Sequence, residues 1–124
     1  MRTPLSSVRG RGSAKFGTDD YWVQRLTAAV LVPLGLFFIV FLIRNVGAPL
    51  EVVKANIANP ICAILLVATI LAGVAHMRVG MQVIIEDYVH DQPWSVLAIV
   101  LNWFFAALIV IGSIWAVAKL SFGM

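Results

Sequence analysis

Three long apolar runs constrain this chain more than any other feature, since none contains Asp, Glu, Lys or Arg: Leu26–Ile43, Ala55–Met77 and Pro93–Ala118. A helix needs about 20 apolar residues to cross a bilayer, and in lipid a lone segment satisfies its backbone hydrogen bonds by forming a helix. The 124-residue chain is 61% hydrophobic, whereas soluble domains are about 45–50% apolar. We therefore expect an all-α integral membrane fold with three transmembrane helices, at about residues 22–43, 60–85 and 93–118.

The basic residues ahead of the first apolar run indicate how the chain is oriented. We divide the chain into a basic N-terminal arm, residues 1–20, and a three-helix membrane anchor domain, residues 21–124. Lys and Arg are enriched on the inner side of membranes, so we expect the N-terminus inside and, after three spans, the C-terminus outside. The Arg- and Ser-rich, acid-poor arm is also typical of an organelle transit peptide, and this alternative stays open. Nucleic acid is not an expected partner, because no soluble basic face is present.

His76 is the first candidate functional residue, because an ionisable side chain within a membrane span is costly and usually functional. The positions within about 60° of His76 on a helix are small or polar: Thr69, Gly73, Gly80, Val83 and Asp87. Small residues allow a neighbouring helix or a flat cofactor to approach closely. Neutral imidazole is a common metal ligand, and a haem needs such a ligand beside a flat cavity. The plainer alternative is a buried histidine that bonds to a neighbouring helix.

A haem with two histidine ligands would need a second chain. The only other histidine, His90, lies 14 residues from His76, which is about 21 Å along a helix and too far to share one iron. If His76 ligates haem iron, the protein is therefore expected to be a subunit of a larger complex.

Asp87 and Tyr88 mark the end of the second span and are the second candidate site. A quinone carbonyl needs a hydrogen-bond donor at the membrane edge, and a phenol O–H is such a donor. Asp87 lies beside the tyrosine, where it would orient the hydroxyl or position a proton donor. Tyr88 follows His76 by 12 residues, about 18 Å of helix. The alternative is an ordinary interfacial tyrosine beside acids in water.

Arg25, at the start of the first span, has two possible roles. It either extends to lipid headgroups or faces inward and pairs with an anionic group. No phosphate-binding glycine loop, Cys-x-x-Cys pair or nucleophile elbow is present, so we expect no catalytic residues for soluble-enzyme chemistry on this chain.

The segment His76–Tyr88 resembles the signature of the small membrane-anchor subunit, the D subunit, of succinate dehydrogenase (respiratory complex II). That pattern is a histidine, a Gly-Met pair beginning four residues later, and Asp-Tyr at eleven and twelve residues, all of which this sequence keeps. The segment Gln24–Ala28 is also similar to the Arg-x-Thr start of the family's first span. Together with the length and the three spans, the resemblance covers essentially the whole chain.

The resemblance implies roles for four residues. His76 would be one axial ligand of haem b, with the other histidine on the companion C (cytochrome b) anchor subunit. Tyr88 would hydrogen-bond ubiquinone with support from Asp87, and Arg25 would lie near the haem propionates or the quinone pocket.

The resemblance also implies a function and partners. The chain would anchor the flavoprotein and iron–sulfur subunits of succinate:ubiquinone oxidoreductase to membrane lipid. The complex would carry electrons from succinate to ubiquinone in the tricarboxylic acid cycle and aerobic respiration. We expect a multi-pass protein of a bacterial inner (cytoplasmic) membrane rather than of the mitochondrial inner membrane. Two alternatives remain: the anchor of a related fumarate reductase, and a cofactor-free structural membrane anchor.

Overall fold

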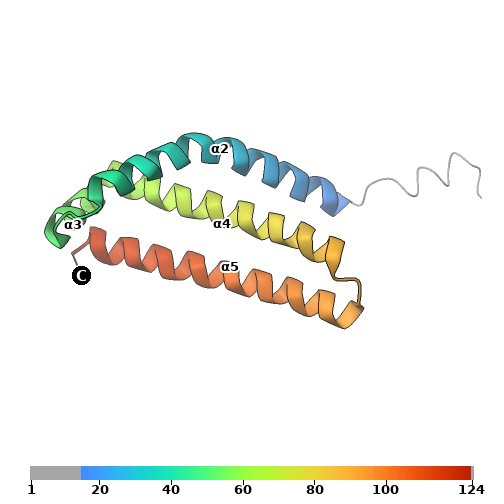
Figure 1. Ribbon diagram of the computed structural model, residues 1–124. Helices are drawn as coiled ribbons and strands as arrows, with labels where there is room; N and C mark the ends of the chain where they lie inside the picture. Colours follow the sequence, from blue (N-terminus) through green and yellow to red (C-terminus); the bar gives the residue numbers. More distant parts are fainter. Residues whose placement is uncertain (1–14, 124) are drawn as a thin grey trace, which may run out of the picture.

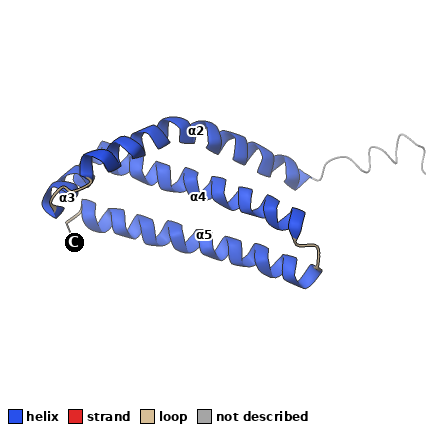
Figure 2. Cartoon of the chain, viewed as in Figure 1, coloured by secondary structure: helices blue, strands red, loops and turns tan. Residues whose placement is uncertain are grey.

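The computed structural model describes residues 15–123, and its regular elements are all helices (Figures 1 and 2). The four helices are α2 (Lys15–Asn45), α3 (Leu50–Ala58), α4 (Pro60–Tyr88) and α5 (Gln92–Ser121). Residues 1–14 lie outside the described part of the chain, and with them most of the basic arm. The orientation expected from that arm therefore stays a prediction.

Three of the helices are long and apolar enough to cross a membrane, which confirms the all-α, three-span prediction. Their candidate spans are Asp19–Asn45, Pro60–Tyr88 and Gln92–Ser121, of 27, 29 and 30 residues. At about 1.5 Å per residue each exceeds the roughly 30 Å hydrocarbon core. The helices therefore extend into the headgroup layers or cross the bilayer at a tilt.

The first helix differs in extent from its predicted span. It begins at Lys15, well before the expected boundary near residue 22. A helix keeps its internal hydrogen bonds in water as well as in lipid, so hydropathy locates the span but not the helix end. Pro33 lies inside α2, which continues through it to Asn45, and Figure 1 shows this helix following a curved path.

Local sequence accounts for the connections between helices. Gly47 adopts φ 78°, a left-handed conformation that glycine takes at little cost, and the chain turns there from α2 into α3. The Asn56 side-chain amide donates to the Asn45 side-chain oxygen at 2.8 Å across this turn. Asn59 then caps α4 by accepting a hydrogen bond from the Ile61 N–H at 3.0 Å, which stabilises a helix start.

Helix α4 is the centre of the fold, as Figure 1 shows. It packs along both α2 and α5, which share little contact with each other. The first residues of α2, the end of α4 and the start of α5 all lie at one end of the molecule, and α3 lies at the other. The chain is therefore an open arrangement of three long helices rather than a closed bundle.

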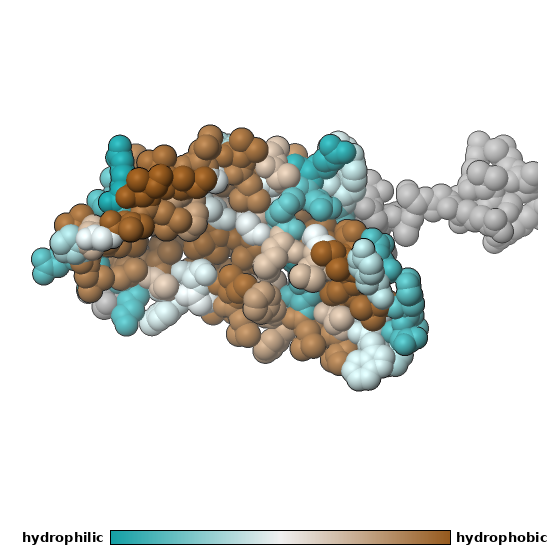
Figure 3. Space-filling model, viewed as in Figure 1, coloured by the Kyte–Doolittle hydropathy of each residue, from teal (hydrophilic) through white to brown (hydrophobic). Residues whose placement is uncertain are grey.

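The internal core is small for so apolar a chain. Its buried apolar side chains are Leu34, Ile57, Leu66, Val79, Ile85 and Ala106. Most other large apolar side chains face outward, and Figure 3 shows their brown surface extending over the helices. Such an extent of exposed apolar surface marks contact with lipid or with other proteins.

Candidate functional site

His76 lies on a groove formed between α4 and the first half of α2. The groove has a volume of about 390 Å³, and the α2 residues that line it with His76 are Tyr21, Gln24, Arg25 and Ala28. These α2 positions are spaced by one, three or four residues, which places them on one side of the helix. The structure therefore brings two of the predicted site residues, His76 and Arg25, to the same groove.

A hydrogen bond to Thr27 holds the His76 ring against α2. The Thr27 Oγ1 atom lies 3.1 Å from His76 Nδ1, and the same oxygen lies 2.6 Å from the backbone carbonyl oxygen of Val23. This contact matches the plainer alternative of a histidine bonded to a neighbouring helix, but it uses only one of the two ring nitrogens. The Nε2 atom has no hydrogen-bond partner among the side chains described from Asp19 to Gly123.

Arg25 stacks on an aromatic ring at the edge of the groove. Its guanidinium carbon lies 5.1 Å from the centroid of the Tyr21 ring, within the distance at which a cation interacts favourably with an aromatic face. The Arg25 side chain is exposed, so its donors are available to a group that enters the groove. The contact orients a positive charge on the same surface as the histidine.

The small residues around His76 leave open space rather than fill a contact within this chain. A Cβ atom built at Gly73 would meet nothing within 4 Å, and one built at Gly80 would meet only the Gln24 amide nitrogen, at 4.0 Å. Packing within the chain therefore does not require glycine at either position. The stripe is free to be covered by a surface from outside the chain.

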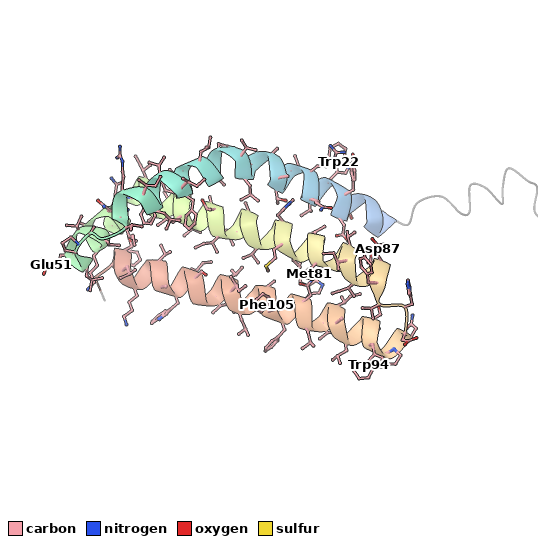
Figure 4. The ribbon with its side chains drawn as sticks, viewed as in Figure 1. Trp22, Glu51, Met81, Asp87, Trp94 and Phe105 are labelled. Carbon is pink, nitrogen blue, oxygen red and sulfur yellow. The ribbon has the colours of Figure 1, made fainter. Side chains whose placement is uncertain are left out.

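The second predicted pair lies apart from this groove. Asp87 and Tyr88 are in the last turn of α4, and both side chains are exposed, Tyr88 to 79%. Figure 4 shows Asp87 near the end of the molecule that also carries Trp22 and Trp94, as expected for a membrane interface. The 12 helical residues from His76 to Tyr88 span about 18 Å, so the two candidate sites are separate.

Sequence reasoning assigned no role to Arg78, and the structure shows one. The Arg78 side chain is 13% exposed and lies 4.0 Å from the Asp20 carboxylate of α2. Its guanidinium carbon is 3.8 Å from the centroid of the Trp103 ring on α5. It also donates to the Gln82 side-chain oxygen at 3.0 Å. Arg78 thus connects α4 to both of its neighbours.

Asn102, a polar residue within the apolar run of α5, adds a further bond between α4 and α5. It is 7% exposed, and its side-chain amide donates to the Arg78 backbone carbonyl at 2.9 Å. Thr27 and Trp103 were not singled out as contacts of His76 and Arg78. The signal for Thr27 was its polar hydroxyl at the start of an apolar run, but sequence alone does not identify its partner.

Metal ligation at His76 would have to be shared with another molecule. Across residues 15–123, no three His, Cys, Asp or Glu side chains gather where they could hold a metal ion together. The groove therefore offers one imidazole and one cationic side chain, an arrangement suited to a group that brings its own metal and negative charge.

Comparison with known proteins identifies the family. The family model for the succinate dehydrogenase/fumarate reductase transmembrane subunit matches residues 1–111. A succinate dehydrogenase hydrophobic membrane anchor subunit of Rickettsia bellii is 29% identical over 94% of each chain. The corresponding subunit of Paracoccus denitrificans is 26% identical over 98% of this chain and 93% of its own.

A succinate dehydrogenase membrane anchor subunit of Reclinomonas americana is 31% identical over 70% of this chain and 75% of its own. No solved structure matches the chain. Three membrane-crossing helices, a match over most of the sequence and relatives of nearly equal length agree with one another. The chain belongs to the family of succinate dehydrogenase membrane anchor subunits.

Proposed function

We propose that this chain anchors a succinate:ubiquinone oxidoreductase, supplies one axial ligand to haem b and forms part of the ubiquinone site. The observation that carries the proposal is the groove that places His76 and Arg25 side by side on the α2–α4 surface. The dehydrogenase chemistry of the complex belongs to other subunits, a flavoprotein and an iron–sulfur protein.

The residues of the groove fit a haem. His76 keeps Nε2 available, and Arg25 presents a cation that suits a propionate carboxylate. The open stripe at Gly73 and Gly80 gives a flat macrocycle room to approach α4. A second histidine ligand would come from the companion C (cytochrome b) subunit. When bound, the haem supplies one-electron redox chemistry, while this chain orients it and balances its charge.

The residues at the end of α4 fit a quinone site that is completed by other subunits. The Tyr88 hydroxyl donates a hydrogen bond to a quinone carbonyl, and Asp87 beside it holds that hydroxyl or a proton-carrying water in place. Because Tyr88 is 79% exposed, the remaining walls of the pocket come from partner chains. The start of α2, which follows most of the basic arm, lies at this same end. Because Lys and Arg are enriched on the inner side of membranes, this end is the inner one. The flavoprotein and iron–sulfur subunits dock there, on the inner face of a bacterial cytoplasmic membrane.

A reduced-minus-oxidised spectrum of the detergent-purified complex tests the haem role. We expect a b-type signal in the wild type and its loss in His76→Leu, because leucine has no ligand atom. His90→Leu is the matched control, since His90 is an exposed residue of the loop after α4 and its replacement should leave the spectrum intact. An unchanged spectrum in His76→Leu would remove His76 as a ligand.

Two alternatives make different predictions. A wild-type complex with no b-type signal would favour a cofactor-free membrane anchor. The family description also includes fumarate reductase. A complex that reduces fumarate with quinol much faster than it oxidises succinate with ubiquinone would favour that assignment.

A further inference from the structure

We propose that Thr27 is a positioning residue that fixes the tautomer and orientation of His76, with the proton on Nδ1 and the lone pair on Nε2. The inference rests on the proposed role of His76 as a haem ligand and deepens it. A residue of α2 thereby sets which nitrogen of a histidine on α4 is able to bind a metal.

The first question is which atom accepts the Thr27 hydroxyl proton. The Thr27 oxygen lies 2.6 Å from the Val23 carbonyl oxygen, a distance typical of O–H···O hydrogen bonds. Two oxygens this close repel each other unless a proton lies between them, so the hydroxyl donates to Val23. The Gln24 carbonyl at 3.2 Å is the longer contact and competes weakly for the same proton.

The histidine tautomer follows from that proton. A hydroxyl has one proton and two acceptor lone pairs. With the proton directed to Val23, the Thr27 oxygen presents only lone pairs to His76 Nδ1 at 3.1 Å. The ring nitrogen must therefore donate, which requires an N–H on Nδ1. A neutral imidazole with Nδ1 protonated has its lone pair on Nε2, and that atom is then the one able to bind a metal.

The same hydrogen bond changes how strongly the Nε2 lone pair of His76 binds a metal. A hydrogen bond from the second ring nitrogen fixes the ring orientation and raises the basicity of the ligating nitrogen. Loss of such partners usually weakens metal affinity or activity by about 10- to 100-fold. Hydrogen bonding around an axial ligand also tunes the redox potential of haem. A stronger donor stabilises the ferric state, so the Thr27 bond lowers the midpoint potential.

Thr27→Val tests this inference, because valine keeps the branched shape and removes the oxygen. We expect weaker haem retention on dilution, by about 10- to 100-fold in affinity, and a midpoint potential more positive than that of the wild type. Thr27→Ser retains a hydroxyl and should restore both properties. If Thr27→Val does not assemble, Thr27→Ala removes the same oxygen from a helix with a residue of high helix propensity.

Ser113→Ala is the matched control. Ser113 is a half-buried hydroxyl residue of α5, the helix that shares little contact with α2, and it lies outside the groove of His76. Its replacement removes one hydroxyl from a membrane helix without touching the histidine or the stripe around it. Haem content and midpoint potential should stay at wild-type values, so a general effect of losing a hydroxyl is separated from the specific one.

The outcomes distinguish this inference from the proposed function. If the wild type holds haem through His76 but Thr27→Val matches it in haem retention and midpoint potential, the positioning role of Thr27 is wrong and the ligand role of His76 stands. If Thr27→Val and Ser113→Ala change these properties equally, the effect is not specific and the inference is also wrong. A wild type without haem, or His76→Leu with an unchanged spectrum, overturns both.

Discussion

His76 and Arg78 lie two residues apart on α4 but serve different surfaces. At 100° per residue their side chains point about 200° apart, His76 to the groove beside α2 and Arg78 to the junction of three helices. Arg78 finds its partners within the chain: Asp20, Gln82 and the Trp103 ring. His76 has one bonded nitrogen, on an open groove.

This difference separates an ionisable residue that is satisfied within the chain from the one that we propose as a ligand. A polar group in a membrane span is costly unless its hydrogen bonds are satisfied. The chain satisfies Arg78 internally, and the result is a connection between helices. For His76 the chain provides a partner for Nδ1 only. Glycine residues and Arg25 lie around the ring, and Nε2 is left for a group from outside the chain. Hydropathy alone does not indicate which of the two residues is paired within the chain.

The largest effect on stability should come from Arg78→Leu. Leucine loses the stacking on Trp103 and the weaker, partly exposed ion pair with Asp20, a combined cost of about 2 kcal/mol. Thermal unfolding of the detergent-purified complex should show a lower melting temperature, while the b-type haem spectrum of the assembled fraction is unchanged. A normal melting temperature with an altered haem spectrum would reverse the roles given to Arg78 and His76.

Tyr88→Phe extends the comparison to the end of α4, where another polar group is left open. We expect ubiquinone reduction to fall by about tenfold, or about 1.4 kcal/mol in barrier height, because the phenol O–H is lost. Succinate oxidation by a soluble artificial acceptor and the melting temperature should not change. Equal loss of both activities would indicate a defect in assembly and place Tyr88 with Arg78 as a structural residue.

The smallest effect should come from Asp20→Asn. Asparagine keeps an oxygen for the Gln82 amide, which donates to Asp20 at 3.3 Å, and loses only the charge opposite Arg78. The pair is separated by 4.0 Å and Asp20 is 36% exposed, so solvent weakens the attraction to about 0.5 kcal/mol. A change in melting temperature as large as that of Arg78→Leu would show that the ion pair, not the Trp103 contact, dominates the cluster.

The sequence predicted the features that depend on one helix at a time. Three uncharged runs located the spans, and the spacing around His76 located a stripe of small residues on α4. These follow from hydropathy and from the 100° rotation per residue, which are local properties.

Contacts between helices could not be predicted in the same way. Thr27 and His76 are 49 residues apart, and the helices that carry them are apolar on most sides, so periodicity does not indicate which faces meet. The Arg78–Trp103 stacking could not be predicted for the same reason. In a membrane helix the outward surface is as apolar as the inward one, and the hydrophobic pattern that orients soluble helices is lost.

The central place of α4 bears on how the protein is made. Because α2 and α5 share little contact, the α2–α4 pair does not depend on the last helix for its packing. Both partners of the Thr27–His76 bond have left the ribosome once the chain has been translated through Tyr88 and a further tunnel length. The Thr27–His76 bond can therefore form during membrane insertion, before α5 packs against α4.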